Sequence, residues 1–148
     1  MKKPEIILIG GGGHCRACID VIEEEGRFNI AGIVDVQEKL GESILGYSII
    51  GTDADLNRLS TQYEYFFITV GQIKSSGLRT NLFDKLKDLG VTIPIIISPN
   101  SYVSKYVKME EGTIVMHHSI VNAGSQLGKN CIVNTKALIE HDCTVKDY

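Results

Sequence analysis

Aliphatic residues recur at every sixth position through the last third of the chain. A period of six fits neither an amphipathic helix nor a two-faced sheet, but it is typical of a parallel β-helix in which each flat side takes one short strand. We therefore predict a solenoid for this part of the chain, with an ordinary β-meander as the alternative. The series has no gap and consists of Val103, Met109, Val115, Val121, Leu127, Val133, Ile139 and Val145.

A second register of mostly small residues lies four positions after the aliphatic one. Small side chains suit the narrow interior of a β-helix beside one large side chain. If three hexads form one triangular coil, residues eighteen positions apart stack on one another. The members of this register are Val107, Thr113, Ser119, Ser125, Cys131, Ala137 and Cys143.

The first hundred residues alternate instead between apolar runs and amphipathic segments. This alternation is typical of a parallel sheet covered by helices. Because the period changes near Ser98 and Pro99 cannot continue a sheet, we expect a Rossmann-like domain over residues 1–98 that packs directly on a β-helix over residues 99–148. The pattern predicts strands over residues 5–9, 29–35, 65–70 and 93–97, and helices over residues 14–25, 52–59 and 76–89.

Composition and charge narrow the function. The 148 residues are 43% hydrophobic, which is enough for a buried core. The formal net charge is −3 and the lysines are scattered, so we expect no basic surface for a nucleic acid. The longest apolar runs are far too short to span a bilayer, and the N-terminus lacks a signal-peptide pattern. We therefore expect a cytoplasmic protein that binds no nucleic acid and does not insert into a membrane.

The four cysteines lack the spacing of a disulfide framework, which fits a reducing compartment. Cys15 and Cys18 have the redox-active spacing at the start of a helix. The glycines before them and the solenoid after them favour instead the packing of Cys18 on the sheet. Cys131 and Cys143 lie on different sides of a coil, so we expect no disulfide between them.

Four consecutive glycines, residues 10–13, separate the first strand from the first helix. Their N–H groups and the helix N-terminus can face an anion or a sugar hydroxyl. The dinucleotide fingerprint is incomplete, because Cys15 stands where the third glycine belongs. Asp35 ends the second strand, where an acid commonly accepts a hydrogen bond from a ribose. The pattern favours a nucleotide-like ligand. The alternative is that the glycines only make the turn and Asp35 only begins a loop.

One histidine of the hexads stands in a setting that suits acid–base chemistry. In a triangular coil His141 lies at a corner above Ala123, with its side chain pointing outward. Glu140 and Asp142 flank it, so a carboxylate on either side could orient the imidazole and raise its basicity. Asn134 precedes it by one side of the triangle and could reach a substrate from the neighbouring face. The alternative is an ordinary solvated corner histidine.

Two further histidines stand at a corner of the expected coils. His117 occupies the same corner register as His141, one side of the triangle out of phase, and His118 is its neighbour. A metal site made by the three is conceivable, but nothing in the spacing fixes them in one tetrahedron. We therefore expect no metal.

Several segments of the chain resemble one enzyme family. They are similar to the NeuD-type sialic-acid O-acetyltransferases and, more distantly, to the PglD-type N-acetyltransferases that act on UDP-4-amino sugars. The resemblance extends over the whole chain, and its most specific part is the Asn-Thr-x-x-x-x-Glu-His-Asp stretch. The segments are residues 10–14, 69–79, 112–119 and 132–142.

The resemblance implies a fold and an activity. The Rossmann-like domain would hold a sugar or a nucleotide-activated sugar, and the second half would be a left-handed β-helix that forms a homotrimer. Acetyl-CoA would bind between adjacent β-helices of the trimer and donate the acetyl group in surface-glycan biosynthesis. The transfer would then need proximity and a base, and no covalent enzyme intermediate.

The resemblance also implies roles for individual residues. His141 would deprotonate the acceptor amine or hydroxyl, Asp142 would raise the basicity of His141, and Asn134 would make a polar contact close to the reaction. The sugar nucleotide would be contacted by Gly12, Gly13, His14, Asp35 and Gly71.

Two departures from the family pattern leave questions open. Relatives that bind UDP-sugars carry paired acids at the end of the second strand, whereas Val36 follows Asp35 here. The nucleotide, the sugar and the choice between O- and N-acetylation therefore stay open. Family members also continue through further hexads that bind CoA, so we expect a shortened form with much of the CoA site absent and with little or no activity.

Two other functions compete with the acetyltransferase. The first is a nucleotide-sugar-binding or regulatory fragment that keeps the glycine loop but lacks transfer chemistry. The second is an NAD-type dehydrogenase domain, which the incomplete glycine fingerprint and the hexads disfavour. Binding of sugar nucleotides, acetyl-CoA and NAD separates the three.

Overall fold

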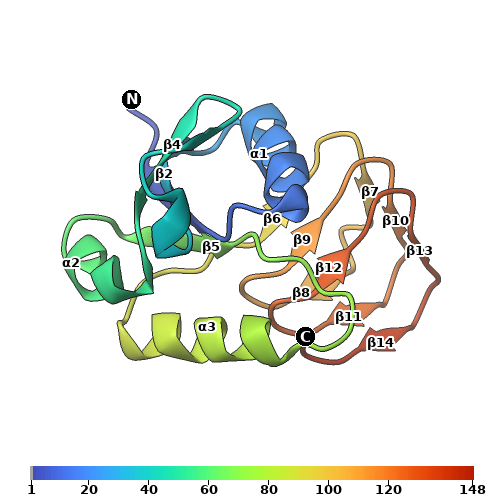
Figure 1. The fold of residues 1–148 in the computed structure, drawn as a ribbon. Coiled ribbons are helices and arrows are strands. Elements are labelled where there is room, and N and C mark those ends of the chain that lie inside the picture. The colour runs from blue at the N-terminus through green and yellow to red at the C-terminus, as the bar shows by residue number, and fades with distance from the viewer. Residues whose placement is uncertain (1) are drawn as a thin grey trace.

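The computed structural model describes residues 2–148. It shows an α/β unit followed by a three-sided parallel β-helix, and the two lie side by side (Figure 1). This arrangement confirms the predicted fold class and excludes the β-meander, because the strands of the second half pair in parallel.

The α/β unit is built on five strands: β1 (Glu5–Ile9), β2 (Asn29–Val34), β3 (Ser43–Ile44), β4 (Tyr47–Gly51) and β5 (Tyr65–Ile68). Their order in the sheet is β3-β4-β2-β1-β5. All pairings are parallel except that of the short edge strand β3 with β4. The inner strand β1 has neighbours on both sides and helices over both faces, which is why residues 6–9 form an uninterrupted buried apolar run.

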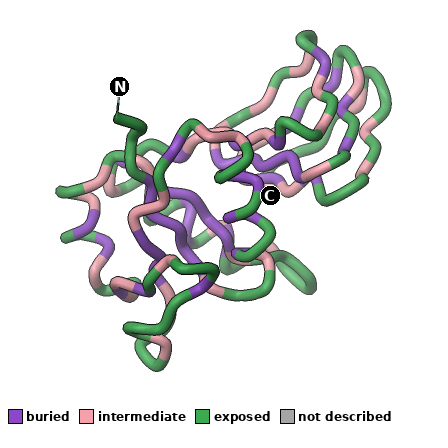
Figure 2. Tube along the Cα trace, turned by 90° about the horizontal axis from the view of Figure 1, so that it is seen from above, coloured by how far each residue is buried: buried purple, intermediate pink, exposed green. Residues whose placement is uncertain are grey.

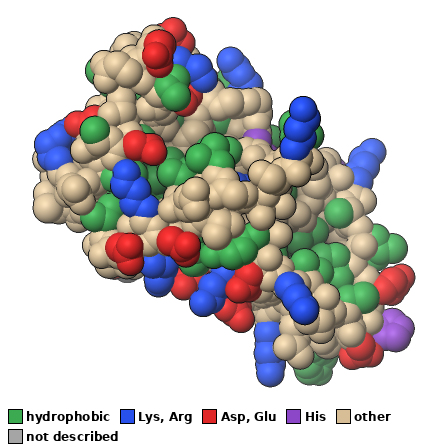
Figure 3. All heavy atoms as spheres, turned by 60° about the horizontal axis from the view of Figure 1, so that its bottom comes forward, with side chains coloured by type: hydrophobic (Ala, Val, Ile, Leu, Met, Phe, Trp, Pro, Cys, Tyr) green, Lys and Arg blue, Asp and Glu red, His purple; other side chains and the backbone are tan. Residues whose placement is uncertain are grey.

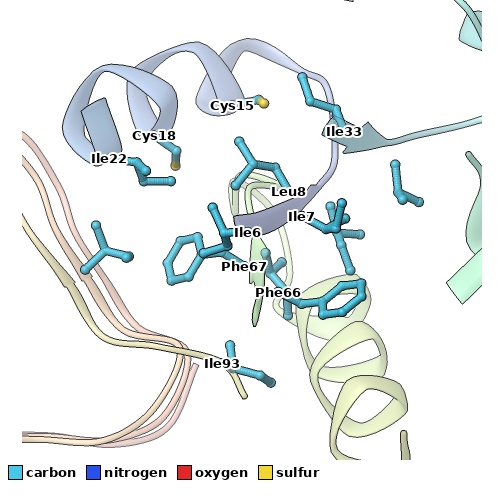
Figure 4. Packing of buried hydrophobic residues seen from close by; sticks show 14 of the residues in the cluster. Ile6, Ile7, Leu8, Cys15, Cys18, Ile22, Ile33, Phe66, Phe67 and Ile93 are labelled. Carbon is cyan, nitrogen blue, oxygen red and sulfur yellow. The ribbon is translucent and has the colours of Figure 1, made fainter. Parts of the chain in front are cut away.

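Helices cover the two faces of this sheet: α1 (Gly13–Glu25), α2 (Leu56–Ser60) and α3 (Gly77–Asp88), with short 3-10 turns η1 (Gln37–Lys39) and η2 (Asp53–Asp55). Figure 4 shows Cys15, Cys18 and Ile22 of α1 pointing toward β1, with α3 on the opposite side of the sheet. Cys18 therefore packs on the sheet, as the sequence predicts.

The predicted strands at β1, β2 and β5 and the three predicted helices are all present. Strands β3 and β4 were not predicted. In β4 only Ile49 and Gly51 are fully buried, so its sequence lacks both an apolar run and a clear alternation.

The β-helix has three sheets, which we name by their outer faces. The docked sheet consists of β6 (Ile96–Ile97), β9 (Ile114–Val115) and β12 (Ile132–Val133). The apolar sheet consists of β7 (Tyr102–Val103), β10 (Ile120–Val121) and β13 (Leu138–Ile139). The polar sheet consists of β8 (Lys108–Met109), β11 (Gln126–Leu127) and β14 (Thr144–Val145). Paired residues are eighteen positions apart, which confirms the triangular coil.

The interior of the β-helix follows the two predicted registers. Val115, Val121, Leu127 and Val133 of the aliphatic register form its buried core. Thr113, Ser119 and Ser125 of the small register are fully buried beside them. Their hydroxyl groups bond to backbone groups, so these polar side chains are satisfied inside the coil.

The predicted strand over residues 93–97 of the N-terminal sheet is wrong. Ile96 and Ile97 form β6, which pairs with β9 in the docked sheet, while Thr92 just before them bridges to β5. The reason is the six-residue period itself, because Ile97 pairs with Val115, eighteen positions later. The β-helix therefore begins inside the range that the sequence assigned to the first domain.

Six successive corners of the β-helix each contain one residue with a positive φ angle, again at every sixth position. The angles lie between 54° and 80°. This left-handed region is easiest for glycine and is tolerated by asparagine and aspartate. The residues are Gly112, His118, Gly124, Asn130, Lys136 and Asp142.

The docked sheet joins the two halves through one hydrophobic core. Ile96, Ile114 and Met116 belong to the same buried cluster as α1, β1 and α3. In Figure 2 the buried segments run through the α/β unit and into the coils next to it, whereas the far corners are exposed. The halves thus pack directly, as predicted.

Two polar links reinforce this packing. Arg79 of α3 is almost fully buried and donates hydrogen bonds to the carbonyl oxygens of Val70 (2.7 Å) and Asn130 (2.9 Å). Asn130 donates in return from its side chain to the Arg79 carbonyl oxygen. Elsewhere, the His117 ring lies 2.6 Å from the Ser98 hydroxyl and 2.9 Å from the Asp20 carboxylate of α1.

On the face shown in Figure 3, basic and acidic side chains are interspersed, without a broad patch of one sign. None of the helices within residues 2–148 is long and apolar enough to cross a membrane.

Candidate active site

The glycine loop connects β1 to α1 and forms the floor of a cleft. Gly10 has a φ angle of +105°, and a side chain there would collide with Val70, so the close approach of the two segments requires glycine. Around Gly12 and Gly13 the space beside the backbone is open. Gly12 is the N-cap of α1, and neither a side-chain cap nor an acidic residue occupies the first turn. The N–H groups of this turn are therefore available to an anionic ligand.

Asp35, at the end of β2, is held at the edge of the same loop. Its Oδ2 accepts hydrogen bonds from the Gly11 N–H (3.1 Å) and from Nζ of Lys39 (2.9 Å), and its Oδ1 accepts one from the Val36 N–H. Burial acts to raise the pKa of Asp35, but the hydrogen bonds from Lys39, Val36 and Gly11 outweigh it and lower the pKa. Asp35 is thus a carboxylate at neutral pH.

His14, in the first turn of α1, packs beneath Gly71. A side-chain carbon on Gly71 would lie 3.3 Å from Cβ of His14, closer than is comfortable. Burial, together with the positive charge of Arg79, lowers the pKa of His14 to about 4, so its ring is neutral at pH 7. Its Nε2 is buried and has no hydrogen-bond partner within residues 2–148. The ring is therefore a neutral polar group with one unused position at the cleft.

The cleft has a volume of about 870 Å³ and is lined from both halves of the chain. It brings together all the predicted substrate-binding residues: Gly12, Gly13, His14, Asp35, Gly71 and Asn134. An adjoining pocket of about 350 Å³ opens beside Asp35, with a mostly apolar lining that includes Val34, Val36, Leu78 and Leu82. The arrangement offers amide groups, a carboxylate and an apolar pocket along one continuous surface.

His141 and Asp142 lie elsewhere, at the corner between β13 and β14. His141 Nδ1 is 2.8 Å from Oδ2 of Asp142, while the other flanking carboxylate, Glu140, accepts a hydrogen bond from Asn122. The hydrogen bond to Asp142 and its negative charge raise the pKa of His141. Because Nδ1 is engaged, Nε2 is the nitrogen that can meet a substrate. Neither His141 nor Asp142 lines the cleft.

Three residues that support the cleft, the junction of the two halves and the His141 corner were not found from the sequence. Lys39 lines the cleft and pairs with Asp35, a contact that could have been sought as an i,i+4 pair. Arg79 meets Asn130, which is 51 positions away, so no local pattern reveals that contact. Asn122 binds Glu140 because the two stack eighteen positions apart.

The cysteines take no part in the site as thiolates. Burial raises the pKa of both Cys15 and Cys18, which keeps them protonated. All four cysteines are free thiols, including Cys131 and Cys143. The redox alternative for the Cys15 and Cys18 pair therefore has no chemical support.

His117 and His118 do not converge with His141 on a metal site. Both ring nitrogens of His117 are engaged, by Ser98 and Asp20. Within residues 2–148 no group of three His, Cys, Asp or Glu side chains is arranged to hold a metal ion.

Comparison with known proteins places the chain in a family. Residues 5–86 match the family model described as the PglD N-terminal domain. The chain belongs to this PglD family. The matched residues include the five-stranded sheet, the glycine loop and most of α3. The PglD part of the predicted resemblance is therefore confirmed.

Solved structures extend the likeness of this PglD-family chain to the β-helix. One of them is a variant of perosamine N-acetyltransferase from Caulobacter crescentus, in which one histidine is replaced by asparagine, in complex with CoA and GDP-perosamine. It matches with a TM-score of 0.88 and 32% sequence identity, and the match covers 96% of this chain and 65% of the perosamine enzyme. The acetyltransferase domain of PglB from Neisseria gonorrhoeae, in complex with acetyl coenzyme A, has a TM-score of 0.86 and 30% identity over 98% of this chain and 68% of its own.

A curated relative comes from a virus. An uncharacterised protein of Acanthamoeba polyphaga mimivirus is 34% identical over 130 residues, which is 86% of this chain and 24% of the viral protein. This PglD-family chain thus spans about a quarter of the viral relative and just under two thirds of the perosamine enzyme. The perosamine enzyme is an N-acetyltransferase, and sialic acid as a substrate stays a prediction.

Proposed function

We propose that this protein is an acetyl-CoA-dependent N-acetyltransferase that acts on a nucleotide-activated amino sugar in surface-glycan biosynthesis. The observation that carries the proposal is the cleft in which the glycine loop, Asp35 and Asn134 meet. The similarity to the perosamine enzyme, whose structure contains CoA and GDP-perosamine, also supports the proposal. N-acetylation is preferred to O-acetylation because the perosamine relative is an N-acetyltransferase.

The cleft suits the parts of a nucleotide sugar. The diphosphate would lie on the amides of the glycine loop and the first turn of α1, with Lys39 beside it. Asp35 would accept hydrogen bonds from the ribose hydroxyls. The apolar pocket next to Val36 and Leu78 has room for the nucleobase. The sugar would then face His14, Gly71 and Asn134.

His141 would act as the general base. As the acceptor nitrogen attacks the thioester carbonyl carbon, a C–N bond forms, the C–S bond breaks, and Nε2 of His141 takes the proton from the nitrogen while the CoA thiolate leaves. Asp142 holds the imidazole in the tautomer that leaves Nε2 free, and it stabilises the imidazolium that forms. Proximity and the base are sufficient, without a covalent enzyme intermediate.

A homotrimer would bring the base to the substrate. The outward residues of the apolar sheet, Tyr102, Ile120 and Leu138, form one exposed column, whereas the polar sheet presents Lys108, Gln126 and Thr144. An apolar column of this kind is typical of a contact between copies. His141 stands at the edge of this sheet, so in a trimer it would face a neighbouring copy, with acetyl-CoA bound between adjacent β-helices.

Calorimetry and an acetyl-transfer assay test the function together. We expect binding of one or more of GDP-sugars, UDP-sugars and CMP-sialic acid. In a form of the chain that includes the further hexads of its relatives, we expect transfer of the acetyl group from acetyl-CoA to a 4-amino sugar nucleotide, followed by mass spectrometry. Binding of the sugar nucleotide without binding of acetyl-CoA by the 148-residue chain would favour the shortened enzyme, whereas absence of transfer by a form with the further hexads would favour the non-catalytic binding module. Tight NAD binding with no sugar-nucleotide binding would contradict both.

A further inference from the structure

The corner that carries His141 rests on two residues of the coil beneath it. Residues eighteen positions apart stack, so Gly124 lies under Asp142 and Ser125 under Cys143. The Asp142 N–H donates to the carbonyl oxygen of Ala123, which fixes the corner backbone above this pair.

Ser125 clamps both ends of the corner from inside the β-helix. Its hydroxyl donates to the carbonyl oxygen of Glu140 (2.7 Å) and accepts from the N–H of Cys143 (3.3 Å). The side chain is fully buried. Thr113 makes the same two bonds to Gly128 and Cys131 at another corner, so the clamp is a recurrent device of these coils.

Gly124 leaves the space that the Asp142 carboxylate occupies. A side-chain carbon on Gly124 would collide with Oδ1 of Asp142, the same carboxylate whose Oδ2 bonds His141. The colliding atom is the end of a flexible, exposed side chain. A larger residue at position 124 would therefore move the carboxylate rather than the backbone.

The backbone conformation alone does not explain a glycine at this corner. Gly124 has a φ angle of +80°, but His118, Asn130 and Lys136 occupy the equivalent position at other corners with φ angles of 54° to 60°. Side chains are thus accommodated at this corner position even with another coil above them, as Lys136 lies above His118. The contact with Asp142 distinguishes Gly124.

From these contacts we infer that Gly124 and Ser125 are positioning residues, which hold the Asp142 carboxylate and the corner backbone so that Asp142 stays bonded to His141. This inference rests on the proposed function, in which His141 is the base. Glu140 makes no hydrogen bond to His141, and its carboxylate accepts one from Asn122 instead.

The ionisation of His141, followed by NMR, tests the role of Gly124 without any need for activity. Asp142 and Glu140 are the charged groups that act on His141, and Asp142 raises its pKa. We expect Gly124→Ala and Gly124→Asn to lower the pKa of His141 to the value in Asp142→Ala. Asparagine tolerates a positive φ, so Gly124→Asn separates the collision from backbone strain. In the Asp142→Ala background, Gly124→Ala should have no further effect.

Ser125 has a matched control in Ser119. Both serines are fully buried in the small register, and each donates to a carbonyl oxygen. Ser119 donates to the carbonyl oxygen of Met116, at a corner that does not carry His141. We expect Ser125→Ala to lower the pKa of His141 and Ser119→Ala to leave it unchanged. In the transfer assay, Gly124→Ala and Ser125→Ala should lower kcat about a hundredfold, as misplacement of a reacting group does, with KM for the sugar nucleotide unchanged.

The outcomes separate this inference from the proposed function. A wild-type pKa of His141 in both Gly124 variants, or an equal change in the Asp142→Ala background, would overturn the role of Gly124. Equal effects of Ser125→Ala and Ser119→Ala would overturn that of Ser125. If a form with the further hexads of the relatives transfers no acetyl group although the His141 pKa responds as expected, the proposed function fails and the positioning stands.

Discussion

His141 Nδ1 lies 2.8 Å from Oδ2 of Asp142, at a corner where the two side chains are 74% and 78% exposed. Solvent competes with such a pair, so it contributes little to the stability of the fold. Because Nδ1 is engaged by Asp142, the outward Nε2 is the nitrogen that is free for chemistry. The same corner lies outside the cleft that gathers the other candidate residues.

Replacement of this histidine tests the base directly. In a form of the chain that includes the further hexads of its relatives, we expect His141→Ala to lower kcat for acetyl transfer at least about a hundredfold, the usual scale of a lost general base. KM for the sugar nucleotide should stay unchanged, because His141 does not line the cleft. His118→Ala, another exposed corner histidine, serves as the control. An unchanged kcat in His141→Ala would remove His141 from the role.

The pH dependence of transfer tests Asp142. Its hydrogen bond and charge raise the pKa of His141, and a general base must be neutral, so kcat/KM should rise with pH through that pKa. Asp142→Ala should move this acid limb to lower pH and reduce the plateau. The same contact stabilises the fold below the unfolded-state pKa of histidine and fades as pH rises through the folded-state pKa, but both side chains are exposed, so unfolding should change little. An acid limb at the wild-type position would contradict the role.

Lys39 tests the placement of the diphosphate. Lys39→Ala should weaken the binding of a nucleoside diphosphate about tenfold, the loss of one charge-assisted contact, and leave the binding of the corresponding nucleoside unchanged. Lys87→Ala is the matched control, because Lys87 pairs with Glu111 and does not line the cleft. Calorimetry at two salt concentrations measures both. Equal losses for diphosphate and nucleoside would place the phosphates elsewhere.

The exposed column of the apolar sheet tests the assembly. We expect Ile120→Glu to convert a trimer into monomers, because it would place a charge in the centre of the column. Gln126→Glu, at the equivalent outward position of the polar sheet, should leave the trimer intact. Sedimentation velocity distinguishes the two states. A wild-type monomer at all accessible concentrations would overturn the trimer.

The fold was predictable where the signal is local and repeated. Each hexad of the β-helix carries its own aliphatic and small residue, so the period identifies the coil before any long-range contact is known. The assignment of residues 93–97 was wrong because a five-residue apolar run has no period of its own and fits a strand of either sheet. Strand β4 was not predicted because its sequence contains no apolar run of that length.

The candidate site was less accessible to sequence reading. The glycine loop and Asp35 follow from their order along the chain, since β1 and β2 are neighbours in the sheet. Asp142 bonds His141, whereas Glu140 is bonded by Asn122, which lies close to it only because the coils stack. Asn134 lines the cleft, whereas His141 does not. This difference results from the way the docked sheet packs on the α/β unit, which no local sequence pattern predicts.

The link between Arg79 and Asn130 gives a prediction for stability. Arg79 is 1% exposed and donates only to uncharged oxygen atoms, and burial lowers its pKa to about 10. Truncation by Arg79→Ala removes the donor from the carbonyl oxygens of Val70 and Asn130 and from Oδ1 of Asn130, whereas the Asn130 amide N–H keeps its bond to the backbone carbonyl oxygen of residue 79. We expect a loss of about 3 kcal/mol in the free energy of unfolding, measured in urea.

Two variants separate the contact from other effects of such a deletion. Asn130→Gly keeps the positive φ angle without strain and removes only the side-chain bonds, so it should lose about 1–2 kcal/mol. Arg79→Lys keeps the charge but not the planar fork, so it should recover little of the loss in Arg79→Ala. If the effects of Arg79→Ala and Asn130→Gly add in full in the double variant, the two residues are not coupled, and the link contributes nothing to the docking of the β-helix on the α/β unit.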